Sequence, residues 1–245
     1  MIWSERPTLR RPVMLVAFKG WNDAADAASN ALAWMVNRWE ALPIARVDTE
    51  TYFDFQATRP DVQIIRGNAR SIIWPSVALS VARLPDGPHD VILVSGREPN
   101  LSWRGLCDEL IGAARSLGSE MIVTLGALLG DVPHTRPVPL IGTAPDGEVA
   151  LELGLRPSDY EGPTGIIGVL HDSCRLARMP SVSIWASVPH YLARPPNPAA
   201  TRALLAAMPK LVGAGVDHHE LDAAALLWRR QVDRAVGDDA ELSAY

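Results

Sequence analysis

The stretch LVAFKGWNDAADAASNAL, residues 15–32, decides the fold of this chain. Its first part is an apolar run typical of a buried β-strand, and its last part is rich in alanine with apolar positions at helical spacing. A turn with a single glycine, Gly20, joins the two parts. Since a strand, a glycine turn and a helix begin many phosphate-binding sites, the stretch poses a question of ligand as well as of fold.

The turn itself favours helix capping over phosphate binding. A phosphate cradle needs several free backbone N–H groups and usually more than one glycine. Here bulky Trp21 follows Gly20, and neither G-x-x-x-x-G-K-[ST] nor G-x-G-x-x-G occurs in the chain. Asp23, beside the expected helix start, would repel an anion but would cap the helix well.

Length and composition indicate one globular α/β protein. The chain has 245 residues, 48% of them hydrophobic and 21% charged, which is enough to bury a sizeable core. The net charge of −5 predicts no nucleic-acid or anionic-membrane partner. No apolar run approaches the roughly 18 residues that span a membrane. The N-terminus lacks an apolar signal core, so we expect a cytoplasmic protein.

Short apolar runs predict the strands. Four read as strands buried on both faces, at residues 13–18, 91–95, 121–125 and 182–186; three more are expected at residues 44–48, 72–79 and 138–143. Helices alternate with them: the first capped by Asn22 or Asp23, the second capped by Ser102 and ended by Gly118, the third over about 164–178. The alternation predicts a three-layer α/β/α fold with a mostly parallel or mixed sheet.

The character of the chain changes after residue 196. Asn197 and Pro198 predict a helix start, and Pro209 must end or kink that helix. A second helix is expected from Asp217, with Glu220 completing a capping box. We expect residues 1–196 to form the α/β/α domain. Residues 197–245 would form a C-terminal helical hairpin, packed on that domain or on a neighbouring subunit.

Four turns should converge at the carboxyl ends of the strands, where parallel sheets usually bind ligands. As a ligand or partner pocket we name Lys19, Trp21, Asn22, Asp23, Arg97, Glu98, Asp131, His134, Arg136, His190 and Tyr191. In a ligand site the two arginines would hold an anion, either histidine would transfer a proton, and Trp21 or Tyr191 would stack on a ring. Alternatively these turns are ordinary exposed loops, or a self-assembly interface with Arg97–Glu98 and Asp131–Arg136 ion pairs.

Other chemical signals are weaker. His171 and Cys174 are three residues apart on a helix and could form an activated thiolate, but a small buried cysteine explains the pattern better. His218 and His219 are adjacent and would point apart, so no metal site is expected. With no H-E-x-x-H, C-x-x-C or G-x-S-x-G in the chain, we assign no catalytic residue, no metal and no cofactor.

Six stretches, in order along the chain, resemble one family. They are GWNDAADAAS, YFDFQATRP, VSGREPNLSW, TLGALLGDVPHTRPVP, YEGPTGIIGVLHDSC and SVPHYLARPPNP. Together they resemble the proteasome-assembly-chaperone-two-like family in its actinobacterial form. The resemblance implies an α/β/α fold like that of the purine nucleoside phosphorylases, self-association, and a distant relation to chaperones that assemble the proteasome α-ring.

The resemblance implies a non-catalytic assembly or interaction factor, with the chain itself and proteasome subunits as candidate partners. The alternative is an enzyme or small-ligand binder with a phosphorylase-like fold, acting on an anionic or nucleoside-like ligand. Two positions depart from the family pattern. Ala25 stands where glycine is frequent, and the sequence ends ELSAY rather than in the hydrophobic-tyrosine-any tail of the eukaryotic chaperones, so docking through Tyr245 is not expected.

Overall fold

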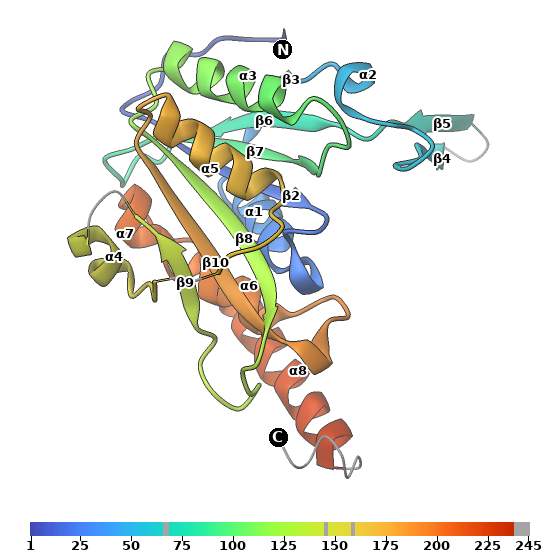
Figure 1. Ribbon diagram of the computed structural model, residues 1–245, viewed down its shortest axis with the longest axis vertical. Coiled ribbons are helices and arrows are strands. Elements are labelled where there is room, and N and C mark those ends of the chain that lie inside the picture. The colour runs from blue at the N-terminus through green and yellow to red at the C-terminus, as the bar shows by residue number, and fades with distance from the viewer. Residues whose placement is uncertain (66–68, 145–146, 158–159, 238–245) are drawn as a thin grey trace.

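The computed structural model describes residues 1–65, 69–144, 147–157 and 160–237 (Figure 1). Eight strands form one mixed sheet in the order β1 (Ile2–Trp3), β3 (Leu42–Arg46), β6 (Val77–Ala82), β7 (Val91–Arg97), β2 (Val13–Lys19), β8 (Met121–Gly130), β10 (Ser181–Pro189) and β9 (Leu140–Thr143). The central four, β7 to β10 in that order, run parallel, and the pairs at both flanks are antiparallel. The expected tail at Tyr245 lies outside the described residues.

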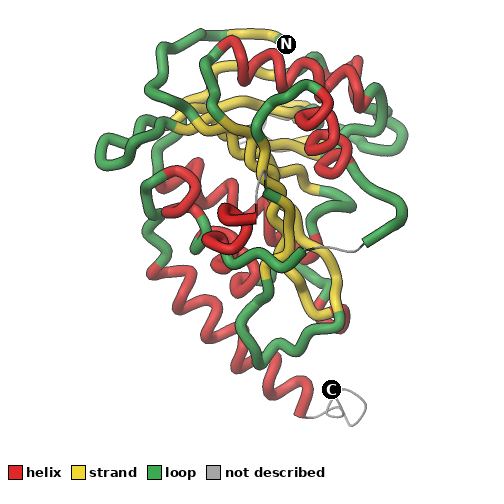
Figure 2. Tube along the Cα trace, turned by 60° about the vertical axis from the view of Figure 1, so that its left-hand side comes forward, coloured by secondary structure: helices red, strands yellow, loops and turns green. Residues whose placement is uncertain are grey.

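Helices cover both faces of the sheet (Figures 1 and 2). One face packs on α1 (Ala27–Arg38), α4 (Gly147–Leu153), α6 (Pro198–Leu205), α7 (Met208–Val212) and α8 (His219–Gly237); the other packs on α2 (Thr49–Tyr52), α3 (Trp103–Ser116) and α5 (Ile166–Leu176). Alternate residues of β2, such as Leu15 and Met14, enter the two different cores. Burial on both faces explains why β2 is a continuous apolar run, and the expected three-layer fold is confirmed.

One expected strand is wrong. Residues 72–79 are split by Pro75, which lacks an N–H group and restricts the residue before it. β5 (Ala69–Ile73) ends before that proline and pairs with β4 (Asp61–Ile65), which the sequence patterns did not reveal, in a separate two-stranded sheet. Only β6, after the proline, joins the main sheet.

The first helix is capped through a short connection. The Oδ1 atom of Asp23 accepts hydrogen bonds from the N–H groups of Ala28 (2.7 Å) and Ser29 (3.2 Å), across the 3₁₀ turn η1 (Ala24–Asp26). Ala25 lies in the left-handed region at φ 52°, a conformation that glycine adopts more easily. By contrast, the expected cap at Ser102 is wrong: its backbone is left-handed and its side chain makes no cap bond, whereas a capping residue needs an extended backbone.

The C-terminal helices follow the expectation in part. Asn197 accepts a bond from the N–H of Ala200, and α6 packs on α1 and β10 while α8 packs on α6. The expected capping box is wrong, because Glu220 forms an ion pair with Arg38 (2.7 Å) on α1 instead. In Figure 2, α8 runs away from the body toward the C-terminus. A domain boundary at residue 197 stays a prediction.

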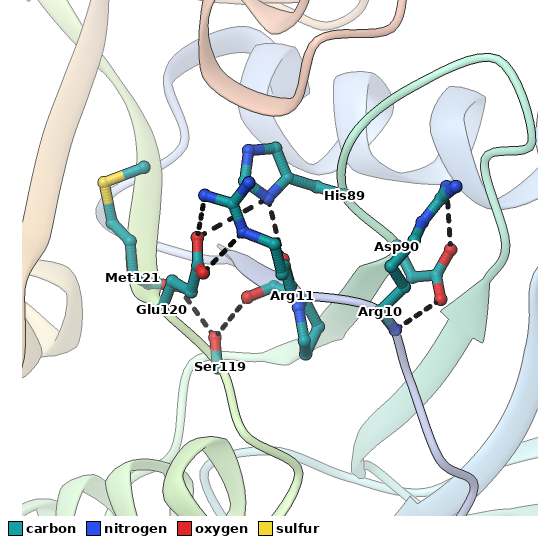
Figure 3. Close-up of polar contacts among 8 residues, drawn as sticks. Arg10, Arg11, His89, Asp90, Ser119, Glu120 and Met121 are labelled. Atoms are coloured by element: carbon teal, nitrogen blue, oxygen red, sulfur yellow. Dashed lines mark hydrogen bonds and ion pairs between the residues drawn. The ribbon is translucent and has the colours of Figure 1, made fainter.

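Ion pairs and hydrogen bonds tie the amino ends of β2, β7 and β8 together (Figure 3). Arg11 forms a bidentate pair with Glu120, 2.8 and 3.3 Å between the bonded atoms, and this hydrogen-bonded pair lowers the pKa of Glu120. Buried Asp90 accepts hydrogen bonds from the backbone N–H groups of Arg10 (2.7 Å) and Leu84 (3.3 Å). These contacts close the end of the sheet opposite the candidate site. No helix among the described residues is long and apolar enough to span a membrane.

Candidate functional site

Glu98 is the centre of the candidate site. It follows β7 directly, and its Oε2 accepts a hydrogen bond from the backbone N–H of Trp21 (2.9 Å). Its Oε1 accepts bonds from the side-chain amide of Asn22 (2.6 Å) and from the backbone N–H of Ile166 (3.0 Å), the first residue of α5. The carboxylate therefore lies at a helix N-terminus, where the helix dipole favours negative charge. The turn after β2 does bind an anion, and that anion belongs to the chain itself.

Two glycines make room for this carboxylate. A Cβ atom on Gly20 would lie 2.7 Å from Cβ and 2.8 Å from Oε2 of Glu98. A Cβ atom on Gly165 would lie 2.6 Å from Glu98 Oε1 and 2.2 Å from the side-chain oxygen of Asn22. All four distances are far below van der Waals contact, so any larger residue would push the turn or the helix away. The glycine of the opening stretch thus serves the approach of Glu98.

Asp23 is buried next to this centre. Burial raises its pKa above the ordinary value, while the hydrogen bonds from Ser29 and Ala28 act in the opposite direction. Only Oδ1 is used for capping: Oδ2 has no hydrogen-bond partner among the described residues, and the same holds for Oδ1 of Asn22. The expected helix cap is confirmed for Asp23, whereas Asn22 uses its side chain to hold Glu98.

A cleft of about 410 Å³ opens beside Glu98. It lies between the ends of β2 and β7 and the start of α3, and its walls are Lys19, Gly20, Thr58, Arg97, Glu98, Pro99, Asn100 and Trp103. Both cations in its wall are paired with carboxylates that do not belong to the predicted site residues. Lys19 contacts Asp26 (2.7 Å), and Arg97 contacts Asp61 (3.5 Å) rather than Glu98. Trp21, 64% exposed, does not line the cleft.

The third and fourth turns form a different cluster. Val13 of β2 pairs with Met121 of β8, and in this register β8 and its neighbour β10 continue three residues beyond the level of Lys19, the last residue of β2. The loops after β8 and β10 therefore begin about 10 Å further along the sheet than the turn after β2. There the Tyr191 hydroxyl lies 2.8 Å from Nδ1 of His134 and accepts a bond from its backbone N–H (3.0 Å). Nε2 of His134 lies 2.9 Å from a carboxylate oxygen of Asp233 on α8. The two ring nitrogens thus connect the loop after β8 to Tyr191 on one side and to α8 on the other.

The remaining predicted residues surround that second cluster or lie at the surface. Arg136 lines a cavity of about 530 Å³ between its loop, α6 and α8, together with His134, Leu226 and Trp228. His190 is exposed and packs edge-on against the ring of Tyr191, 5.4 Å between ring centres. Asp131 is exposed after β8. The structure therefore brings together the first and second turns, and separately the third and fourth. Whether either group binds a ligand or partner stays a prediction.

The two thiols lie in an inert environment. Burial raises the pKa of Cys107 to about 11 and that of Cys174 to about 12. The ring of His171 is directed to the hydroxyl of Ser181 (3.1 Å between Nδ1 and Oγ), and burial lowers its pKa. Such thiols are protonated at neutral pH, so the interpretation as structural cysteines is supported. The described residues contain no group of three or more metal-binding side chains.

Three partners of the site were missed from the sequence. Gly165 and Ile166 had a local signal, since a glycine directly before a helix invites close backbone approach. Asp233 had none: one carboxylate on an exposed helix face cannot be told from its neighbours without the fold.

Fold and site define an α/β/α protein whose strand ends are tied together by its own side chains. The model of the PAC2 family matches residues 17–236, and the chain belongs to that family. It is similar to a solved PAC2 family protein from Streptomyces avermitilis, with 47% identity and a TM-score of 0.88 over 96% of this chain and 99% of the other. It is also similar to the Mycobacterium tuberculosis proteasome-assembly chaperone homologue Rv2125, with 44% identity and a TM-score of 0.87 over 95% and 99% of the two chains.

More distant structures share the fold alone. Pyrococcus furiosus PbaB, an archaeal proteasome activator, has 15% identity and a TM-score of 0.74, with 96% of this chain and 97% of that chain covered. No curated protein matches the sequence. The predicted membership in the proteasome-assembly-chaperone family is confirmed.

Proposed function

We propose that this chain is a non-catalytic assembly or interaction factor that binds other proteins, with proteasome subunits as the first candidates and self-association as part of its mode of action. The observation that carries the proposal is the position of Glu98. Its carboxylate takes up the N–H groups of Trp21 and Ile166 and the Asn22 amide at the strand ends. Those are the donors that an enzyme of this fold class would direct at an anionic ligand.

Charge around the turn supports the same conclusion. A phosphate or carboxylate ligand would have to displace Glu98 or lie beside its negative charge. The two cations at hand, Lys19 and Arg97, already pair with Asp26 and Asp61. The histidine of the second cluster, His134, has both ring nitrogens bonded to Tyr191 and Asp233. Three of the groups predicted for anion binding or proton transfer, Lys19, Arg97 and His134, are thus used within the chain.

The relatives point to the class of partner. The Mycobacterium tuberculosis relative, 44% identical over nearly the whole chain, is described as a proteasome-assembly chaperone homologue. For the present chain this role is a proposal, because function depends on the sites that a protein carries and not on its fold alone.

The test is direct binding. Purified chain and purified proteasome α-subunits from the same organism are mixed at about 10 μM each and analysed by sedimentation velocity and native electrophoresis. The expected result is a complex of defined stoichiometry and a changed rate of α-ring formation. Separate sedimentation of both proteins, with an unchanged rate of ring formation, would contradict the proteasome proposal.

The cleft beside Glu98 supports one alternative, a binder of small anionic or nucleoside-like ligands. Its wall combines two cations with the ring of Trp103. In this case a panel of nucleosides and nucleoside phosphates should raise the melting temperature, and Arg97→Ala should abolish the rise. Arg136→Ala is the matched control, since Arg136 lines the other cavity. Equal rises in wild type and Arg97→Ala would exclude the cleft as the site.

A further inference from the structure

The cavity of about 530 Å³ between the loop after β8 and the helices α6 and α8 is named here the α6–α8 groove. It differs in chemistry from the cleft beside Glu98, because most of its lining residues are apolar. Its floor is formed by alanines of the two helices, and Leu226 and Trp228 stand at its side: the alanines are Ala199, Ala203, Ala206 and Ala225. An apolar lining with a few polar groups, and a volume in this range, are typical of binding pockets.

The polar part of this lining is mostly cationic. Arg136, Arg202 and Arg229 line the groove together with one carboxylate, Asp222. Three positive charges and one negative charge give the groove a formal charge of +2, whereas the whole chain carries −5. The groove is therefore a local site of positive potential on an acidic protein, and such a site attracts an anionic group.

The three arginines differ in what they already bind. Arg202 is paired with Asp222 at one end of the groove, 2.7 Å between the bonded atoms. Arg229 follows Asp222 by two turns of α8 and donates a hydrogen bond to the carbonyl of Thr135. The guanidinium of Arg136, next to Thr135 in the chain, makes no hydrogen bond or ion pair with any other described residue. The groove thus has an exposed, unpaired cation at one end of an apolar floor.

We propose that the α6–α8 groove binds a segment of a partner protein in which apolar residues stand next to an aspartate or glutamate, whose carboxylate pairs with Arg136. The apolar side chains cover the alanine floor, and the carboxylate matches the planar fork of the guanidinium. Clusters of arginine recognise acidic motifs in this way. A nucleic acid or a free phosphate would leave the apolar floor uncovered, and a flat membrane surface does not enter a groove between two helices and a loop.

The length of the groove sets the size of the segment. Its lining residues run from Asp222 to Arg229 on α8 and from Ala199 to Ala206 on α6. At 1.5 Å per residue each helix contributes a wall about 10 Å long. An extended chain rises about 3.3 Å per residue, so the groove accommodates about three residues. A contact of this size is weak, and an isolated peptide should bind with a dissociation constant on the order of 100 μM.

This inference rests on the proposed function, because it assigns a recognition surface to an interaction factor. The two can fail separately. If the whole chain binds α-subunits but the groove shows no preference for an acidic peptide, only the groove is excluded. If the groove recognises acidic peptides but the chain does not bind α-subunits, the groove stands and the proteasome is excluded as the partner.

The test is fluorescence anisotropy with two labelled, amidated hexapeptides, Ala-Leu-Leu-Glu-Ala-Ala and Ala-Leu-Leu-Gln-Ala-Ala. They are titrated with wild type, Arg136→Ala and the control Arg230→Ala, an exposed arginine of α8 that does not line the groove. Wild type and Arg230→Ala should bind the acidic peptide about 10-fold more tightly, the contribution of one hydrogen bond between charged groups. Arg136→Ala should bind both peptides equally, because the preference depends on a pair that only Arg136 completes.

A second pair of variants tests the apolar floor. Ala206→Phe should fill the groove and weaken binding of both peptides at least about 10-fold, since the leucines lose their contact area. The control Ala224→Phe changes an exposed alanine of α8 outside the lining and should leave binding unchanged. Circular dichroism and melting temperature show whether each variant is folded, and the Arg136 variants decide the question if Ala206→Phe is not.

Four results would overturn the proposal. The first two are absence of peptide binding at about 500 μM chain, five times the expected dissociation constant, and equal binding of both peptides by wild type. A third is at least about 10-fold tighter peptide binding after removal of residues 238–245, which hold three acidic residues and would then be the natural occupant. The fourth is dissociation of a homo-oligomer by the acidic peptide, which would assign the groove to a second copy of the chain.

Discussion

Replacement of Glu98 by alanine tests how much the carboxylate at the strand ends contributes to stability. The change leaves three donors unpaired: the N–H groups of Trp21 and Ile166 and the buried amide of Asn22. A hydrogen bond to a charged group contributes about 1.5–3 kcal/mol, and the bond from exposed Trp21 belongs at or below the lower end. We therefore expect Glu98→Ala to lower the free energy of unfolding by about 4 kcal/mol. Glu98→Gln keeps the shape of the side chain but removes the negative charge at the α5 N-terminus and places its own NH2 group against one of the three donors. We expect this variant to lower the free energy of unfolding by about 1.5 kcal/mol.

Urea unfolding followed by circular dichroism measures both variants, with an unchanged m-value as the sign that the same cooperative unit unfolds. Glu98→Ala also vacates an anion position, so acetate or formate should raise the melting temperature of this variant and leave that of the wild type unchanged. A loss below about 1 kcal/mol, less than one bond to a charged acceptor, would refute the reasoning, because the three donors would then not depend on Glu98.

Three further predictions concern buried groups. Asp23→Asn keeps the acceptor for Ala28 and Ser29 and removes a buried charge, so in urea unfolding it should match or exceed wild-type stability at pH 7. This advantage should fade as the pH falls through the raised pKa of Asp23. Asp23→Ala should lose about 1–2 kcal/mol of unfolding free energy, and an equal loss in both variants would disprove the capping role. Burial lowers the pKa of His171 in the folded state, so protonation favours the unfolded chain and stability should fall as the pH drops below about 6.5. His171→Gln should flatten this dependence between pH 7 and 5. Parallel stability curves for wild type and variant would contradict the prediction. Neither Cys107 nor Cys174 should react with a disulfide reagent at pH 8 in the native protein, whereas both should react in guanidinium; labelling of the native protein within minutes would contradict their burial.

The layers of the fold could be predicted from the sequence because the core strands are apolar on both faces. In β2, Leu15 and its neighbour Met14 enter opposite cores, so the run is continuous and its length is visible. Strand ends were less visible. β8 continues through Gly126 to Gly130, residues that look like a turn but stay in the sheet because β10 pairs with them along the whole length.

The two-stranded sheet of β4 and β5 escaped prediction because its strands lack a buried face. Val62 and Ile64 alternate with polar residues, as in a strand half covered by a core, but the body supplies no cover. Pro75 was present in the sequence and marked the break between β5 and β6, yet the apolar residues on both sides suggested one strand.

The site could be predicted in its residue types and only partly in its geometry. The turns after β2 and β7 do meet, because these strands are parallel neighbours. The partner of Glu98 could not be foreseen, since the start of α5 is 68 residues away along the chain. His134 and Tyr191 lie apart from Glu98 because β8 and β10 are longer than β2 and β7, a difference that depends on strand pairing rather than on the loops themselves.

The most direct test of the central claim, that this chain binds proteins and holds its own anion at the strand ends, is native mass spectrometry of the protein purified from its source organism. The account predicts masses at whole multiples of 26.6 kDa, alone or with the mass of a protein subunit added. A persistent extra mass of a few hundred daltons on each chain would contradict the account and identify a small ligand in its place.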